Sequence, residues 1–270
     1  MGGYRDKVVL ISGSSRGVGR ALAARLVAEG ARVVLGARGE QRLLETRDAL
    51  RSAGGQVEAV AGDVGRRQDA ERLVAAAVER FGRLDAVVNN AGVSMRGEFA
   101  ELDPAVCERV IQTNLLGSVY LSRAAAEQLI AARGQLLFVS SIAGLFGLPG
   151  ASVYCASKMA LTGLAESLRI ELAAAGVHVG VIYLGFTEHD PQKRILAADG
   201  SPVPPDRPAH HSQDEAAGLI LDMMRRRRRE LVMTPVGQLG RWVHRLSPGL
   251  VERAIRWARS SRWGLYEKFS

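Results

Sequence analysis

The sequence lacks several features that would place it in particular protein classes. Its only cysteines, Cys107 and Cys155, are too few for a disulfide framework, which favours a reducing cytoplasmic environment. No stretch approaches the ~20 consecutive apolar residues of a membrane-spanning helix, and the first residues contain no apolar signal region. The pair His210-His211 has no other ligand at metal-binding spacing, so we expect no metal site.

Positive charge is concentrated at one end of the chain. The net charge is +8, but residues 225–270 alone hold twelve Arg or Lys residues and three Glu residues. The rest of the chain is therefore close to neutral. A nucleic-acid-binding domain would carry its basic surface on the fold itself, so we expect no nucleic-acid partner.

Short β-branched segments alternate with alanine-rich helical segments along most of the chain. We predict strands at 7–12, 31–37, 56–62, 84–92, 134–141, 177–184 and 230–235, and helices at 17–29, 40–52, 68–81, 104–132 and 152–174. Apolar strands between helices predict an α/β fold, a doubly wound parallel sheet with helices on both faces. We expect one Rossmann-type domain over 1–235 and a basic helical extension over 236–270.

The segment 186–212 is long, polar and rich in proline. It is either a disordered insert or a lid over a site, because long loops in compact domains are often functional. Ser212 and Glu215 form a capping-box pattern that predicts a helix, which ends in the run Arg225–Arg229.

Two short motifs suggest chemistry. The turn after the first strand reads SGSSRGVG, and glycines at 13, 17 and 19 would let the backbone approach a phosphate at a helix N-terminus. Tyr154 and Lys158 lie one helical turn apart on one face, and a neighbouring ammonium group lowers the pKa of a phenol. Alone, each motif is also compatible with a plain tight turn or with an ordinary solvated helix face.

Together the motifs resemble the short-chain dehydrogenase/reductase family over roughly residues 5 to 190. The resemblance is carried by the glycine turn at 12–19, by the acidic Asp63 in GDV, by the NNAG motif at 89–92, by Asn114 in TNLLG, by Ser141, and by the YxxxK pair Tyr154 and Lys158. Their order and spacing follow the family pattern.

The resemblance implies a catalytic role for four residues. Tyr154 would exchange a proton with the substrate oxygen, Ser141 would hold that oxygen, and Lys158 would lower the pKa of Tyr154 and hold the cofactor ribose. Asn114 would hold a water that links Lys158 to solvent. The implied cofactor contacts are Gly13, Ser15, Arg16, Gly17, Val18, Gly19, Arg38, Asp63, Val64, Asn90, Ala91, Gly92, Tyr154, Lys158 and Thr187.

The cofactor is predicted to be NADP rather than NAD. The second strand ends in Gly36-Ala37-Arg38 without the acid that holds a ribose 2′-hydroxyl, and Arg16 lies in the glycine turn, so two guanidinium groups would face a 2′-phosphate.

The sequence departs from the family pattern after the sixth strand, where most members have Pro-Gly. Leu184-Gly185 is similar to the branch that contains 11-beta-hydroxysteroid dehydrogenases, which favours a lipophilic substrate. His189 replaces the usual threonine, and Thr187 would stand in for it.

We therefore expect an NADP-dependent oxidoreductase that interconverts a carbonyl and a secondary alcohol on a small molecule. The alternative is a catalytically idle nucleotide-binding or membrane-associated protein on the same fold. The family resemblance also implies a homodimer or homotetramer, with the helices 104–132 and 152–174 at the interface.

The C-terminal extension leaves two alternatives open. It contains all three tryptophans, and residues 250–258 combine an apolar stripe with arginines. A basic amphipathic helix with tryptophans can lie on a membrane, but such a stripe can also pack on protein. We favour packing near the pocket entrance or a subunit interface, with weak peripheral membrane contact as a second role.

Overall fold

The structure is a computed structural model that describes residues 3–188, 190–205 and 210–260. Its centre is a seven-stranded parallel sheet with the order β3-β2-β1-β4-β5-β6-β9. The strands are β1 (Val8–Ser12), β2 (Arg32–Ala37), β3 (Gln56–Ala61), β4 (Ala86–Asn89), β5 (Gln135–Ser141), β6 (His178–Leu184) and β9 (Glu230–Val232). The chain reverses direction across the sheet between β1 and β4, which in such sheets opens a crevice at the carboxyl ends of the strands.

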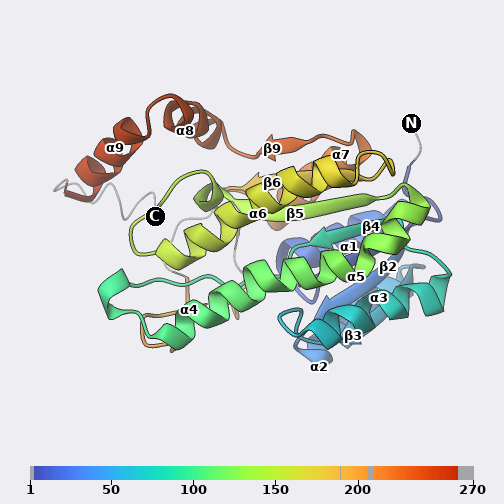
Figure 1. The fold of residues 1–270 in the computed structure, drawn as a ribbon. Coiled ribbons are helices and arrows are strands. Elements are labelled where there is room, and N and C mark those ends of the chain that lie inside the picture. The colour runs from blue at the N-terminus through green and yellow to red at the C-terminus, as the bar shows by residue number, and fades with distance from the viewer. Residues whose placement is uncertain (1–2, 189, 206–209, 261–270) are drawn as a thin grey trace.

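Helices cover both faces of this sheet (Figure 1). On one face lie α1 (Gly17–Ala28), α2 (Glu40–Ser52) and α7 (Gln213–Arg225), and on the other lie α3 (Arg67–Phe81), α5 (Gly117–Ala132) and α6 (Ser152–Glu171). The predicted doubly wound α/β fold is confirmed.

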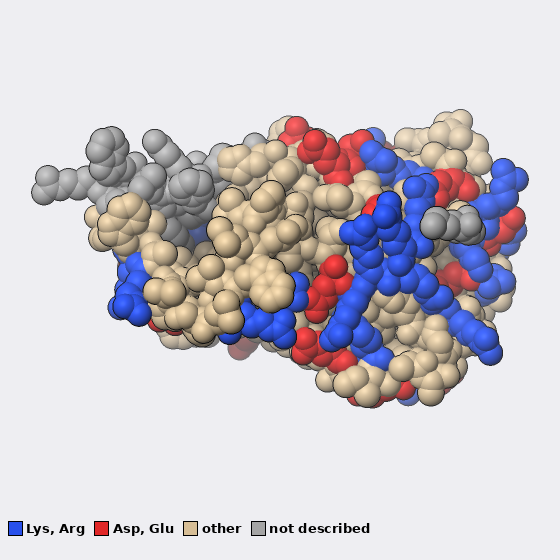
Figure 2. All heavy atoms as spheres, turned by 90° about the horizontal axis from the view of Figure 1, so that it is seen from above, with Lys and Arg blue, Asp and Glu red and all other residues tan. Residues whose placement is uncertain are grey.

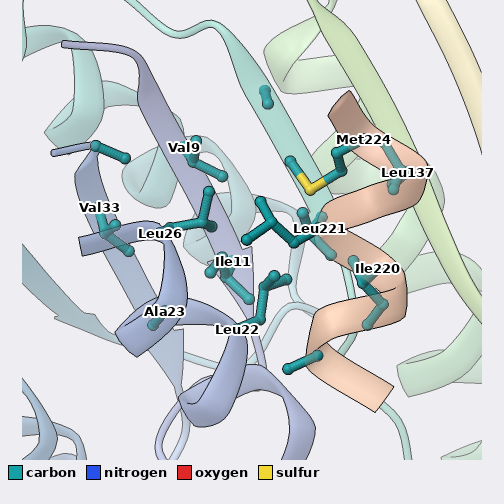
Figure 3. Close-up of a cluster of buried hydrophobic side chains, with 14 of the residues drawn as sticks. Val9, Ile11, Leu22, Ala23, Leu26, Val33, Leu137, Ile220, Leu221 and Met224 are labelled. Atoms are coloured by element: carbon teal, nitrogen blue, oxygen red, sulfur yellow. The ribbon is translucent and has the colours of Figure 1, made fainter. Parts of the chain in front are cut away.

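Both faces bury apolar side chains that alternate along the strands. Val9 and Ile11 point toward α1 and α7, where they meet Leu22, Leu26 and Leu221 in one fully packed cluster (Figure 3). Val8 and Leu10 point to the opposite cluster under α3 and α5. Because both faces are buried, the strands are apolar throughout, which is the pattern that the sequence showed.

The predicted helix 104–132 is not continuous. It consists of α4 (Pro104–Ile111), a π-helical turn (Gln112–Leu116) and α5. Asn114 lies in the π-helical turn, and such wide turns within helices are frequent at functional sites. The turn itself contains no proline or glycine, so its residues give no local signal for it.

The segment after β6 is held both by its own backbone hydrogen bonds and by hydrogen bonds to the loop after β4. It contains the short antiparallel pair β7 (Ile195–Leu196) and β8 (Pro202–Val203), and Leu196 exchanges backbone hydrogen bonds with Ser94 and Arg96. The described residues of this segment are thus ordered against the loop after β4. His189 lies outside the described residues.

Two helices follow β9 at the C-terminal end of the described chain: α8 (Pro235–Leu246) and α9 (Pro248–Ser260). The final strand ends at Val232, three residues before the predicted end, because the Thr234 side chain caps α8 and Pro235 occupies its first turn. Helix α8 therefore begins at Pro235. Among the described residues, no helix has the length and apolar character needed to span a membrane. Trp263, part of the predicted extension, lies outside the described residues.

Candidate active site

The glycine turn joins β1 to α1 at the crevice. Gly13 and Gly17 both have positive φ, +66° and +61°, which an L side chain rarely adopts. A Cβ atom on Gly19 would lie 2.5 Å from the Gly13 carbonyl oxygen, so the turn can close only with glycine at 19. At Gly17 a Cβ would meet nothing within 4 Å, because this side of the turn is open. The first N–H groups of α1 receive no side-chain cap, which suits an anionic ligand.

The NNAG segment is tied to this turn by a small set of hydrogen bonds. The Ser12 hydroxyl accepts from the backbone N–H groups of Asn90 and Ala91, each at 3.0 Å. The Asn90 side chain donates to the carbonyl oxygens of Ser12 and Gly13. The loops that follow β1 and β4 are therefore held as one unit across the crevice.

A cavity of about 940 Å³ opens along these loops. All of the predicted cofactor contacts line it: Gly13, Ser15, Arg16, Gly17, Val18, Gly19, Arg38, Asp63, Val64, Asn90, Ala91, Gly92, Tyr154, Lys158 and Thr187. Ser141 lines it as well. Residues that lie far apart in the chain thus share one cavity.

Basic side chains gather where the cavity passes the end of β2. Arg38 lies 3.8 Å from the Asp63 carboxylate, and its pKa is lowered by burial and then by the positive charge of Arg109. Arg16 donates a hydrogen bond at 3.3 Å to the carbonyl oxygen of Gln192 in the segment after β6. Arg42 also lines the cavity, 3.9 Å from Asp190. This end of the cavity is suited to a phosphate group.

Lys158 and Tyr154 form the other end. The Lys158 ammonium donates to the Val139 carbonyl oxygen at 2.9 Å and lies 5.9 Å from the centre of the Tyr154 ring. Burial, followed by the charge of Lys193, lowers the pKa of Lys158 to about 8. Ser141 ends β5, and its hydroxyl accepts from the Ala143 N–H, which fixes the start of the next loop.

Asn114 lies behind the cavity wall rather than in it. Its buried amide oxygen accepts from the Val93 N–H at 2.8 Å. Its amide nitrogen donates to the Val93 carbonyl oxygen at 3.0 Å and to the Ser157 hydroxyl. Its backbone oxygen accepts from Ser118. A Cβ on Gly92 would lie 3.3 Å from the Asn114 oxygen and 3.4 Å from the Lys158 nitrogen, so the two side chains approach each other there. The side chain of Asn114 therefore braces the wall that carries Lys158.

Several lining residues were not predicted individually. They lie on α2 and on the segment after β6: Arg42, Glu45, Glu188, Asp190, Gln192, Lys193 and Arg194. The composition of 186–212 suggested a lid, but which of its side chains face the cavity depends on pairing with Ser94–Arg96, which has no sequence signal.

Comparison with known proteins identifies the family. A family model described as short chain dehydrogenase matches residues 7–199. The chain belongs to the short-chain dehydrogenase family. This oxidoreductase family accounts for the fold and for the motifs around the cavity.

Named relatives of this short-chain dehydrogenase include an uncharacterized oxidoreductase from Thermotoga maritima, 36% identical over 74% of this chain and 79% of the relative. A putative ketoacyl reductase of granaticin polyketide synthesis from Streptomyces violaceoruber is 38% identical over 70% of each chain. An 11-beta-hydroxysteroid dehydrogenase-like protein, 4A, from Arabidopsis thaliana is 38% identical over 72% of this chain and 65% of its own.

Solved structures agree with the family assignment. A short chain dehydrogenase/reductase from Burkholderia phymatum in complex with NAD superposes with a TM-score of 0.82 at 25% identity, covering 93% of this chain and 96% of that one. An alcohol dehydrogenase from the archaeon Thermococcus sibiricus, complexed with 5-hydroxy-NADP, gives 0.74 at 27% identity, covering 84% and 95%. The neighbours thus include both NAD and NADP-type complexes.

The cavity of this short-chain dehydrogenase fits a nicotinamide dinucleotide. The open face at Gly17 and the uncapped N-terminus of α1 suit a pyrophosphate. The buried ammonium of Lys158 lies at the far end, beside Tyr154, and can donate to a ribose hydroxyl. Arginines line the end nearest β2. Within the described residues, no group of three His, Cys, Asp or Glu side chains could hold a metal ion.

Proposed function

We propose that this short-chain dehydrogenase is an NADP-dependent enzyme that interconverts a carbonyl group and a secondary alcohol. The observation that carries the proposal is the convergence of Ser141, Tyr154 and Lys158 on one end of a cavity whose other end is lined by Arg16 and Arg38. The first group suits proton transfer to a substrate oxygen, and the second suits a phosphate.

The preference for NADP is supported by charge at the end of β2. Residues Gly36 to Gly39 contain no acid, and Arg38 follows the strand directly. An acid here would hold the ribose 2′-hydroxyl of NAD, whereas arginine binds a 2′-phosphate with charge-assisted hydrogen bonds. Arg38 forms an ion pair with Asp63 at 3.8 Å, and this pair is partly exposed. A phosphate can therefore replace Asp63 as the partner of Arg38 at modest cost in free energy.

In the proposed reaction, Tyr154 gives its phenolic proton to the carbonyl oxygen as that oxygen becomes an alcohol. The Ser141 hydroxyl positions the oxygen, and Lys158 favours the phenolate that Tyr154 leaves behind. Bound NADPH supplies the hydride that reduces the carbonyl carbon. In the reverse direction, the phenolate of Tyr154 accepts the proton of the alcohol.

We propose a lipophilic substrate. Leu184 and Gly185 line the cavity where most family members have Pro-Gly. Relatives named as 11-beta-hydroxysteroid and 3beta-hydroxysteroid dehydrogenases, the latter from Mediterraneibacter gnavus at 35% identity, support this substrate class.

We further propose a cytoplasmic homodimer or homotetramer that uses α5 and α6 as its interface. Both cysteines are free, and Cys155 is buried, which suits a reducing compartment. Ile170 on α6 is 81% exposed and Ile130 on α5 is 43% exposed, so both helices present apolar surface for a partner copy.

Two measurements on the purified full chain test the function. We expect NADPH to bind more tightly than NADH in fluorescence titrations, and equal dissociation constants would contradict the cofactor preference. We also expect NADPH to be oxidised in the presence of at least one lipophilic ketone from a panel of ring and chain ketones. The idle nucleotide-binding protein would be favoured if NADPH binds tightly but neither reaction occurs. In that case no ketone oxidises NADPH and no matching alcohol reduces NADP⁺.

A further inference from the structure

Helix α8 is oriented with its polar and small residues toward the protein. Gly237 lies against Thr234 and Ile142, and Gly240 lies against the ring of Phe146. On the same side, Arg241 pairs with Glu230. A helix on the surface of a globular protein normally does the opposite and buries its apolar stripe.

The apolar side of α8 faces outward. Val236, Leu239, Trp242 and Leu246 recur at helical spacing, and they are 78%, 66%, 63% and 84% exposed. A contiguous set of large exposed apolar side chains is uncommon on a protein that has no partner at that surface. We call these four residues, together with Leu250 and Trp257 of α9, the apolar face of the tail.

Helix α9, which packs beside α8, also exposes large apolar side chains. No residue of α9 is buried, and Leu250 and Trp257 are 51% and 67% exposed. Tryptophan is favoured where an apolar region meets water, as at the interface of a lipid bilayer. The two helices thus present an amphipathic pair with a tryptophan on each member.

The charge of the two helices is positive. They hold five arginines and one glutamate. Arg241 and Arg259 pair with Glu230 and Glu98, whereas within the described residues Arg245, Arg253 and Arg256 are exposed and form no ion pair. The occupant of this surface should therefore be both apolar and anionic.

Both helices lie next to loops that carry the site. Helix α8 packs on Phe146, five residues after Ser141, and its His244 ring lies 6.2 Å from the ring of Phe146. Arg259 of α9 bonds Glu98 at 2.8 Å, in the loop that follows the NNAG segment. The two helices therefore lie on the side of the molecule where those two loops meet.

We propose that α8 and α9 form a docking surface for an anionic lipid membrane. Figure 2 shows this side of the molecule, with a broad region of uncharged surface on α8 and α9. Lys and Arg side chains lie at the edge of this region and form a larger group farther along the same face. Apolar side chains in the headgroup region and arginines near lipid phosphates give the binding mode of an interfacial amphipathic helix.

Charge decides between a membrane and a second copy of the chain. A symmetric dimer through this surface would bring the same arginines of both copies together, which costs energy through like-charge repulsion. An anionic bilayer accepts both the apolar side chains and the unpaired arginines. Only the further step, that a lipophilic substrate enters from the bilayer, rests on the proposed function.

Co-sedimentation of the full chain with lipid vesicles tests the docking surface. We expect binding to vesicles of equal parts phosphatidylcholine and phosphatidylglycerol, weakening as salt is raised. The variant Leu239→Gln/Trp242→Gln/Leu246→Gln should bind at least about tenfold more weakly, because it loses most of the buried apolar surface. These three side chains are exposed, so the variant should fold and retain NADPH binding as a check.

Charge variants give a matched comparison. Arg245→Gln/Arg253→Gln/Arg256→Gln should lose about fivefold per arginine on anionic vesicles and lose most of the salt dependence. Arg66→Gln/Arg67→Gln/Arg80→Gln removes the same charge from exposed positions around α3 and should leave vesicle binding unchanged.

Three results with vesicles would overturn the proposal: no binding of the full chain, unchanged binding by the apolar-face variant, or equal loss in the α3 control. A larger particle mass for the full chain than for the apolar-face variant in light scattering without lipid would also overturn it, because the face would then be a contact between copies. Vesicle binding needs no substrate turnover, so a failed ketone assay leaves this test intact.

Discussion

Replacing Lys158 with methionine should make the folded protein more stable while it removes the proposed activity. The Lys158 side chain is 5% exposed, and its ammonium donates to the Val139 carbonyl oxygen at 2.9 Å. Burial and the nearby charge of Lys193 lower its pKa from 10.5 to about 8. Methionine keeps the long apolar stem but carries no charge, so it removes the desolvation cost.

The magnitude follows from the pKa. A pKa lowered from 10.5 to about 8 corresponds to about 3 kcal/mol of cost to the charged form, at 1.36 kcal/mol per pH unit. Losing the hydrogen bond to Val139 offsets about 1 kcal/mol. At pH 7, where the lysine is protonated in both folded and unfolded chains, Lys158→Met should therefore raise the free energy of unfolding by about 2 kcal/mol.

The expected gain in stability depends on pH. Between pH 8 and 10.5 the unfolded chain binds the proton more strongly than the folded chain, so the wild type gains stability as pH rises through this window. The advantage of Lys158→Met should therefore shrink from pH 7 to pH 9.5. Below pH 8 it should stay constant.

Urea unfolding of the cofactor-free protein at the two pH values measures this difference. Lys7→Met is the matched control, because Lys7 is 46% exposed and lies 3.1 Å from Asp85. That substitution removes one partner of the buried Asp85 carboxylate, which stays paired with Arg83, so it should lower stability by about 0.5–1 kcal/mol. A Lys158→Met protein that is less stable than the wild type at pH 7 would refute the reasoning.

Three further predictions concern the cofactor turn, the cofactor preference and the assembly. Arg38→Ala should raise the NADPH dissociation constant about 10- to 100-fold and change that of NADH far less, since it removes a charge-assisted phosphate contact; equal effects in titration would contradict this. Gly19→Ala should destabilise the protein by about 1–3 kcal/mol in urea unfolding and weaken binding of both cofactors, because its Cβ would lie 2.5 Å from the Gly13 oxygen; an unchanged protein would mean that the turn can relax. Ile170→Arg should reduce the particle mass in light scattering, and a monomeric wild type at micromolar concentration would exclude the α5–α6 dimer.

Much of the fold and the cavity lining could be predicted because local signals and tertiary structure agree. Apolar strands separated by amphipathic helices determine a doubly wound sheet, and the turn at Gly13–Gly19 is constrained by sterics that only glycine satisfies. The predicted cofactor contacts share one cavity because their loops all follow carboxyl ends of strands, or begin helices, at one edge of the sheet.

The features that the sequence did not reveal depend on contacts between distant residues. The π-helical turn at Gln112–Leu116 is held by the bonds of Asn114 to Val93, and β7 is positioned by Leu196 bonding to Ser94 and Arg96. The start of α8 has a local signal that the predicted strand at 230–235 did not take into account, since Thr234-Pro235 is a common cap. The outward direction of the apolar face of α8 could not be predicted, because periodicity defines an apolar stripe on the helix but not whether that stripe contacts the protein.

NADPH oxidation by Tyr154→Phe, measured beside NADPH binding, tests most directly the claim that this cavity performs carbonyl–alcohol chemistry. Tyr154 lies beside Lys158 and lines the cavity together with Ser141, and phenylalanine removes only its hydroxyl. With a ketone that the wild type reduces, we predict a rate lower by ~10²- to 10⁴-fold and an NADPH dissociation constant that is nearly unchanged. A loss of only a few-fold would show that another group donates the proton and would contradict the account.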